Sequence, residues 1–337
     1  MAQASSRPRV AVVGTGGSIS IVGRHSLDLA EYGEFGRVLE VDELLALFPE
    51  TSTAADLVAV RFRALRSTAV GPRDWLELNE LIHRLIEGDS RLAGVVVTHG
   101  TATLEETAYF LNLTLKVDLP VVVVGAQRPP TGLSTDAALN LVNAIRVAAA
   151  PAARGLGVLT LLNDEIQAAR EVTKASTYRL QAFRSPDVGL LGYADPDGSV
   201  AFYRAPTRRH APDTIFDTRG VAELPRVDIA YSYAGSDGAA VEALVARGAR
   251  GIVVAGLAPG MLTPGEGEAA AAVRERGVLV VLSTRAGSGR VLARSKLREA
   301  GIVAADNLSP QKARVLAMLA LLHTSDPVAV QRLFDEY

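Results

Sequence analysis

The sequence predicts an α/β protein with a doubly wound, mostly parallel sheet in a larger N-terminal domain and a second, smaller α/β domain at the C-terminus. Two observations lead to this prediction. Short β-branched runs alternate with longer amphipathic stretches, a pattern typical of parallel strands joined by helices. The chain also has 337 residues, more than one ordinary domain needs.

The predicted domains are residues 1–205 and 226–337. Between them, residues 206–225 are polar, hold three prolines and show no periodicity, which is typical of an interdomain linker. In the larger domain, we expect strands at 9–14, 57–63, 94–98, 121–125 and 157–162, and helices at 72–87, 104–113 and 134–150. In the smaller domain, we expect strands at 227–231, 251–255 and 277–282, and helices at 239–247, 266–276, 311–322 and 329–336.

Composition excludes several classes of protein. The net charge of −2 gives no general electrostatic footprint for nucleic acid or anionic lipid. The absence of cysteine excludes disulfides, thiol nucleophiles and cysteine-based metal sites, and the five histidines show no metal-ligand spacing. The opening segment MAQASSRPRV lacks the apolar core of a signal peptide, and no apolar run is long enough for a membrane span. We therefore expect a soluble, cytoplasmic protein that binds neither nucleic acid nor membrane and needs no metal.

Polar clusters that directly follow strands are candidate ligand sites, because open α/β sheets bind ligands beyond the carboxyl ends of their strands. Four such clusters stand out: GTGGSIS at 14–20, THGTATLEET at 98–107, GAQRPP at 125–130 with STDAALN at 134–140, and NDEIQAAREVTK at 163–174.

Each cluster also has a plain structural interpretation. The first glycine turn is similar to a dinucleotide loop, but Ile19 stands where the third glycine of GxGxxG would be. Thr101 or Thr103 would cap the following helix, with Glu105 in its first turn. Lys174 is one of only four lysines and follows a strand. It is either a solvated cation or a base beside a threonine hydroxyl.

Together and in this order, the four clusters resemble the bacterial-type asparaginase/glutaminase family of amidohydrolases. The family carries TGGTIA, HGTDTxEET, GAxRP with S-x-D-x-x-N, and NDEI…ARxVTK, and a late NLSPQKARVLAMLAL resembles its NPQKAR segment. The resemblance covers nearly the whole chain. It implies hydrolysis of C–N bonds other than peptide bonds, a small-molecule amide substrate, no metal or organic cofactor, and a homo-oligomer, either a dimer or a tetramer, with active sites between subunits.

The resemblance also implies roles for particular residues. Ser18 corresponds to the family's first threonine nucleophile, and Tyr32 to the loop tyrosine that activates it. Thr101 and Lys174 correspond to the threonine and lysine of a second triad, in which the lysine accepts the hydroxyl proton. Ser67 corresponds to the serine that holds the substrate's α-carboxylate.

Four positions depart from the family pattern. Ala102 replaces the aspartate of HGTDT, which completes the triad and binds the substrate's α-ammonium. Thr68 stands where Gln or Asp is usual. Residues 255–261, AGLAPGM, lack both asparagines of the family's AGxGNGN. The glutamate that some members contribute from a neighbouring subunit falls near Arg294. A single engineered alanine would explain one of these changes but not all four.

The departures share a direction, because they remove the groups that would accept an ammonium, and an ammonium left unpaired in a closed site is costly. We therefore expect a small amide or related acyl substrate without a free α-amino group, such as the monoamide of a dicarboxylic acid. Lys174, deprived of its charged partner, should lose its proton more readily. Backbone N–H groups of the turns at Gly100 and Ser18 would stabilise the oxyanion.

Three alternatives stay open. The protein is an L-asparaginase of low efficiency, or an asparaginase-shaped protein that holds a ligand without cleaving it, or a nucleotide-binding oxidoreductase. The last rests only on the glycine turn at 14–20. Release of ammonia from a panel of amides separates the first two.

Overall fold

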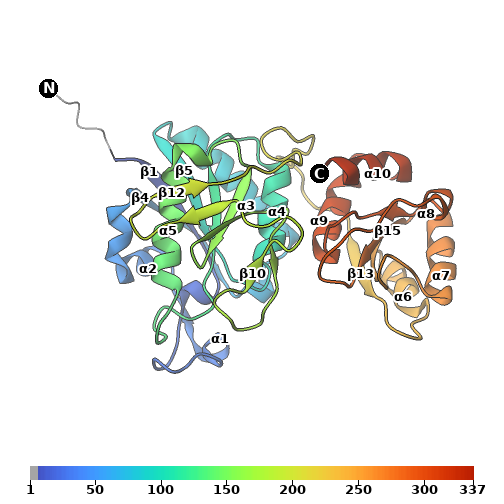
Figure 1. Ribbon diagram of the computed structural model, residues 1–337, viewed down its shortest axis with the longest axis horizontal. Helices are drawn as coiled ribbons and strands as arrows, with labels where there is room; N and C mark the ends of the chain where they lie inside the picture. The colour runs from blue at the N-terminus through green and yellow to red at the C-terminus, as the bar shows by residue number, and fades with distance from the viewer. Residues whose placement is uncertain (1–6) are drawn as a thin grey trace. The chain divides into compact units, whose positions relative to one another are not determined.

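The computed structural model describes residues 7–337 and confirms the predicted α/β class (Figure 1). The chain divides into a larger unit that ends at Arg219 and a smaller unit, Gly220–Tyr337. Each unit has its own sheet and its own apolar core.

The larger unit is built on an eight-stranded sheet in the order β12-β11-β8-β7-β6-β5-β1-β4. Five neighbouring strands, from β7 to β4, are parallel, and the other three are antiparallel additions at one edge. The strands are β1 (Arg9–Gly16), β4 (Asp56–Leu65), β5 (Leu92–Thr98), β6 (Val121–Val124), β7 (Val158–Leu162), β8 (Glu165–Ala168), β11 (Gly192–Ala194) and β12 (Val200–Phe202). The sheet is therefore mostly parallel, as predicted.

Helices cover both faces of this sheet, which is why its central strands are apolar throughout rather than alternating. On one face, α2 (Val41–Leu47) and α5 (Ala137–Ala149) pack in one cluster with Val10 and Val12 of β1. On the other, α4 (Leu104–Thr114) packs on β6 and β7, and α3 (Pro72–Gly88) packs on α4 (Figure 1).

The α3–α4 contact includes Trp75, whose ring stacks on that of Phe110 with centroids 5.5 Å apart. Pro72 occupies the first turn of α3, where its missing amide hydrogen leaves no bond unmade. The helix has 17 residues and a polar face. Within residues 7–337, every helix is too short or too polar to cross a membrane.

The path of the chain creates a crevice at the carboxyl end of β1. From β1 the chain passes to β4 on one side and then returns to β5 on the other. At such a reversal the loops leave the sheet in opposite directions and open a space for ligands. Two small hairpins also belong to this unit: β2 (Ile21–Val22) with β3 (Arg37–Val38), and β9 (Thr173–Lys174) with β10 (Phe183–Arg184). Helix α1 (Tyr32–Phe35) lies between β2 and β3 in the chain.

The smaller unit has a four-stranded parallel sheet in chain order: β13 (Val227–Tyr231), β14 (Gly251–Gly256), β15 (Leu279–Thr284) and β16 (Val303–Ala304). Two helices share an apolar cluster with it, α6 (Ala239–Ala246) and α7 (Pro264–Glu275). The remaining helices are α8 (Ser295–Glu299), α9 (Pro310–Ala320) and α10 (Pro327–Glu336). Of these, α9 packs on β13, β14 and β15.

The segment 206–225, predicted as a linker, is not uniform. Its first part belongs to the larger unit, which extends to Arg219. There Thr214 donates a hydrogen bond from its hydroxyl to the carbonyl of Leu113, and Lys116 Nζ donates to the Thr214 hydroxyl at 2.8 Å. These bonds hold the segment on α4 and the loop after it. The limits of the predicted linker and domains stay predictions.

Candidate active site

Two glycine turns meet at the carboxyl ends of β1 and β5. Gly17 has φ of 82°, and a Cβ placed on it would lie 2.1 Å from the Cα of Gly100. A Cβ on Gly100 would lie 2.3 Å from the Cβ of Ser67. Gly17 N–H donates to the carbonyl of Leu65 at 2.8 Å. The predicted clusters at Ser18, Ser67 and Gly100 are therefore in backbone contact, and only glycine fits at 17 and 100.

A cavity of about 200 Å³ opens beside this contact. Ser18, Tyr32, Ser67 and Thr68, four of the residues singled out in the sequence, contribute to its lining. Arg66 lines it as well, which the sequence did not suggest. None of the nine lining residues is acidic. The cavity thus offers hydroxyl groups and one guanidinium, a donor-rich environment suited to an anionic or carbonyl group.

Tyr32 reaches Ser18, a contact that the sequence left undecided. A hydrogen bond with the Ser18 side chain holds down the pKa of the tyrosine, while burial, the larger effect, raises it above its usual value. The phenol also donates to the carbonyl of Gln127 at 3.2 Å. Because its pKa is raised, the phenol is neutral near pH 7. A neutral phenol is not a ready-made base.

Thr101 and Lys174, 73 residues apart in the chain, are brought together. Thr101 follows β5 and is 5% exposed, and Lys174 ends β9. Lys174 Nζ lies 2.8 Å from Thr101 Oγ1 and donates to it. Burial lowers the pKa of Lys174, which makes the neutral amine more available as a proton acceptor. The pair has the geometry required of a hydroxyl and its base.

The expectation that Lys174 has no charged partner was wrong. Glu105, in the first turn of α4, accepts hydrogen bonds through Oε1 from the Lys174 backbone N–H at 3.1 Å and the Thr173 hydroxyl at 3.2 Å. Its charge opposes the lowering of the Lys174 pKa. Sequence reasoning placed Glu105 only in relation to the helix dipole, because nothing local in the sequence shows which strand packs across a helix end.

The turn that carries Thr101 is fixed by His99. One nitrogen of its ring is 2.8 Å from the carbonyl of Gly100, and the other is 2.9 Å from the hydroxyl of Thr107. Burial lowers the pKa of His99 to about 4, so the ring is neutral at physiological pH. Thr103 is the N-cap of α4, but its hydroxyl donates to the carbonyl of Ser67 at 2.8 Å instead of capping the helix.

Ala102 and Thr68 have exposed side chains. Ala102 lies between Thr101 and Thr103 in this turn and offers only a methyl group. In the smaller unit, Arg294 donates to the carbonyl of Gly260, so the AGLAPGM turn and the Arg294 segment lie side by side.

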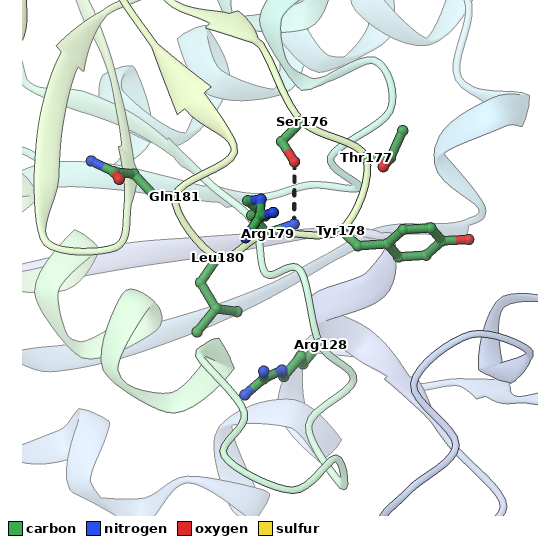
Figure 2. A pocket seen from close by; sticks show the side chains of 7 residues that line it. All are labelled: Arg128, Ser176, Thr177, Tyr178, Arg179, Leu180 and Gln181. Atoms are coloured by element: carbon green, nitrogen blue, oxygen red, sulfur yellow. Dashed lines mark hydrogen bonds between the residues drawn. The ribbon is translucent and has the colours of Figure 1, made fainter.

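A second, open hollow of about 710 Å³ lies between the loop 176–181, which joins β9 to β10, and Arg128 (Figure 2). Figure 2 shows the Ser176 hydroxyl turned toward the backbone nitrogen of Arg179, which donates to it at 3.4 Å. Tyr178 is 74% exposed. The hollow contains none of the site residues expected from the sequence. Within residues 7–337, no group of three or more His, Asp or Glu is placed to hold a metal ion.

Comparison with known proteins decides the family. The model of the N-terminal asparaginase domain matches residues 9–208, and that of the glutaminase/asparaginase C-terminal domain matches residues 226–334. The chain belongs to the asparaginase family. It is 41% identical to L-asparaginase 2 of Bacillus subtilis over 98% of this chain and 87% of that protein. It is 38% identical to the glutaminase-asparaginase of Pseudomonas fluorescens over 97% of this chain and 90% of that protein.

A solved structure supports the same assignment. A crystal structure described as a probable cytoplasmic L-asparaginase from Campylobacter jejuni has a TM-score of 0.91 and 38% identity, and the match covers 98% of this chain and all of that one. This member of the asparaginase family is therefore a hydrolase of C–N bonds other than peptide bonds.

Proposed function

We propose that this protein hydrolyses a small carboxylic amide without a free α-amino group, using the hydroxyls of Ser18 and Thr101 with Lys174 as base. The observation that carries the proposal is the 2.8 Å contact between Lys174 Nζ and Thr101 Oγ1, in a setting where burial lowers the lysine pKa. A neutral amine at that distance accepts the Thr101 proton, so that Thr101 Oγ1 can take up the proton of Ser18 or of water when that oxygen attacks a carbonyl carbon.

The chemistry proceeds in two balanced steps. A hydroxyl oxygen adds to the amide carbon, its proton passes to the base, and that proton then goes to the departing nitrogen, so that ammonia leaves and an ester remains. Water adds to the ester carbonyl and releases the acid, while its proton restores the hydroxyl. Ser18, hydrogen-bonded to Tyr32, is the proposed site of the ester. Backbone N–H groups of the turns at Ser18 and Gly100 are the proposed donors to the oxyanion.

The substrate class follows from the charges around the cavity. Its lining includes Arg66, Ser67 and Thr68 and no acidic residue. Ala102 supplies no acceptor where the family pattern has an aspartate. A carboxylate is well matched to a guanidinium and hydroxyls, whereas an ammonium finds no acidic partner among the residues that line the cavity. The monoamide of a dicarboxylic acid fits this arrangement.

A matched pair of substrates tests the proposal. Succinamate is L-asparagine without its amino group, and glutaramate bears the same relation to L-glutamine. We expect kcat/KM for succinamate to exceed that for L-asparagine by about a hundredfold, since an unpaired ammonium costs roughly 3 kcal/mol. Coupled detection of ammonia measures both. A higher kcat/KM for L-asparagine would refute the substrate assignment and leave the amidohydrolase reaction intact.

Ordinary L-asparaginase activity is the second candidate. It is favoured by 41% identity to a protein named L-asparaginase 2. A ligand-binding homologue without catalysis would give thermal stabilisation by succinamate and no ammonia.

We also propose a homo-oligomer, a dimer or tetramer, on the family resemblance, and a cytoplasmic location on the description of the Campylobacter jejuni structure. The Haemophilus influenzae relative, 37% identical, is named periplasmic. Light scattering of the purified protein and fractionation of cells test these two points.

A further inference from the structure

Glu105 stands behind the Thr101–Lys174 pair and is used by none of the steps above. It is 6% exposed and lies in the first turn of α4, which begins directly after the turn carrying Thr101. Its Oε1 accepts from the backbone N–H of Lys174 and from the hydroxyl of Thr173. One carboxylate therefore ties the strand that carries the base to the helix that follows the hydroxyl.

The second carboxylate oxygen of Glu105 also lies in an unusual environment. Glu105 Oε2 is buried and has no hydrogen-bond partner among residues 7–337. A buried charged oxygen without a donor is costly unless a nearby cation compensates it. Lys174 is a cation close enough for the Glu105 charge to raise its pKa. The two charges are therefore partners, although they share no side-chain hydrogen bond.

We propose that Glu105 is a positioning residue that supplies the counter-charge for Lys174 and holds its backbone so that Nζ stays on Thr101. The proposal rests on the proposed function, because it assigns Glu105 through the base that Lys174 provides. It also explains how the chain tolerates Ala102. The carboxylate that the family pattern places within the turn is missing, but that of Glu105, in the first turn of α4, remains.

This arrangement fixes the lysine from two directions. Oε1 of Glu105 holds the main chain at Lys174, and the Thr101 hydroxyl holds the side-chain nitrogen. Burial lowers the pKa of Lys174 and the Glu105 charge raises it, so the balance of the two sets the pH at which the amine becomes a base.

The decisive variant is Glu105→Gln, which keeps an oxygen for the two donors and removes the charge. With only four lysines in the chain, ¹³C-labelled lysine side chains can be titrated by NMR, and Lys174→Arg identifies the resonance. We expect the Lys174 pKa to fall by about one pH unit in Glu105→Gln. The acid limb of kcat for succinamate should move to lower pH by the same amount. An unchanged Lys174 pKa would overturn the proposal.

The matched control is Glu106→Gln, the same change at the next position of α4, where we expect no shift of the Lys174 resonance. Glu105→Asp covers the event that the glutamine variant does not fold, because it keeps the charge on a shorter side chain. If both variants fold, the Lys174 pKa should be higher in Glu105→Asp than in Glu105→Gln. If only Glu105→Asp folds, its Lys174 pKa should lie within half a pH unit of the wild-type value. A larger fall would contradict a counter-charge role.

The titration does not depend on turnover. A shifted Lys174 pKa together with full activity of Lys174→Met would remove the proposed function and leave the Glu105–Lys174 coupling. An unshifted Lys174 pKa in Glu105→Gln together with an inactive Lys174→Met would remove the Glu105–Lys174 coupling and leave the proposed function.

Discussion

The two halves of the candidate site are built differently. Thr101, Lys174 and Glu105 are buried or half-buried and lie in the turn after β5, in a two-residue strand and at a helix start. Three hydrogen bonds at 2.8–3.2 Å, one of them from Thr173, tie these elements together. The cavity half contains Ser18, Tyr32 and Thr68 on helices of three or four residues, and Arg66 directly before the last of these. Burial and hydrogen bonds restrict the positions of the side chains in the first half. In the cavity half, exposed side chains can be replaced by other residues during evolution without changing the core.

This contrast separates chemistry from recognition. A proton transfer requires its two heavy atoms within hydrogen-bond reach, which a rigid frame supplies. Recognition of a substrate depends on which charges line the cavity, and loop positions can change these charges without disturbing a core. The four departures from the family pattern fall on turns, loops and a three-residue helix, whereas Thr101 and Lys174 are retained.

The largest effect is expected at the rigid half. Lys174→Met should lower kcat for succinamate by about a thousandfold, because it removes the amine that lies 2.8 Å from the Thr101 hydroxyl, while KM changes little. Steady-state ammonia release measures both. Lys116→Met is the matched control, since Lys116 is also half-buried with a pKa lowered by burial, but donates to Thr214 away from the site. Equal losses in the two variants would mean that the effect is structural.

The second expected effect is on stability and involves His99, which holds the turn of the rigid half. The unfolded histidine binds a proton below its ordinary pKa of 6.5, but the folded one only below about 4. Folding therefore loses stability as the pH falls between these values, by about 3 kcal/mol in all. Urea unfolding at pH 7.5 and pH 4.5 measures it.

The control for this loss is a pair of variants. His99→Gln should lose less stability between the two pH values than the wild type, and His25→Gln, at an exposed position, should behave like the wild type. If His99→Gln shows the full loss, the buried ring is not its cause.

The smallest effect is expected in the cavity half. Tyr32→Phe removes the phenol that orients Ser18 and should lower kcat about tenfold with no change in melting temperature, because the phenol is neutral and sits on a four-residue helix. Ammonia release and circular dichroism measure the two quantities. A thousandfold loss would place Tyr32 among the groups that transfer protons and would remove the proposed distinction between the halves.

The sequence allowed the central parallel strands to be predicted because they are short, mainly apolar runs, such as the three valines at 95–97 in β5 and the four at 121–124 in β6. It missed the antiparallel edge, where β11 and β12 have only three residues each and no periodicity to recognise. Bringing Lys174 to Thr101 depended on the family resemblance. No local pattern links positions that far apart.

Arg66 and Glu105 were missed as site residues for the same physical reason. Arg66 was passed over because it precedes the motif serine, and its place in the cavity depends on how the Tyr32 loop lies over it. Glu105 resembled an ordinary first-turn acid. Both act through neighbours distant in sequence, which composition and spacing do not reveal.

The contact between Gly17 and Gly100 has a practical consequence for redesign. A side chain at position 17 collides with the main chain of Gly100, and a side chain at position 100 collides with Ser67, so a mutant library that randomises these two glycines would consist mainly of misfolded clones. Diversity is better placed at Arg66, Thr68 and Ala102, whose side chains are exposed. A small library there should yield variants with new amide preferences that still fold.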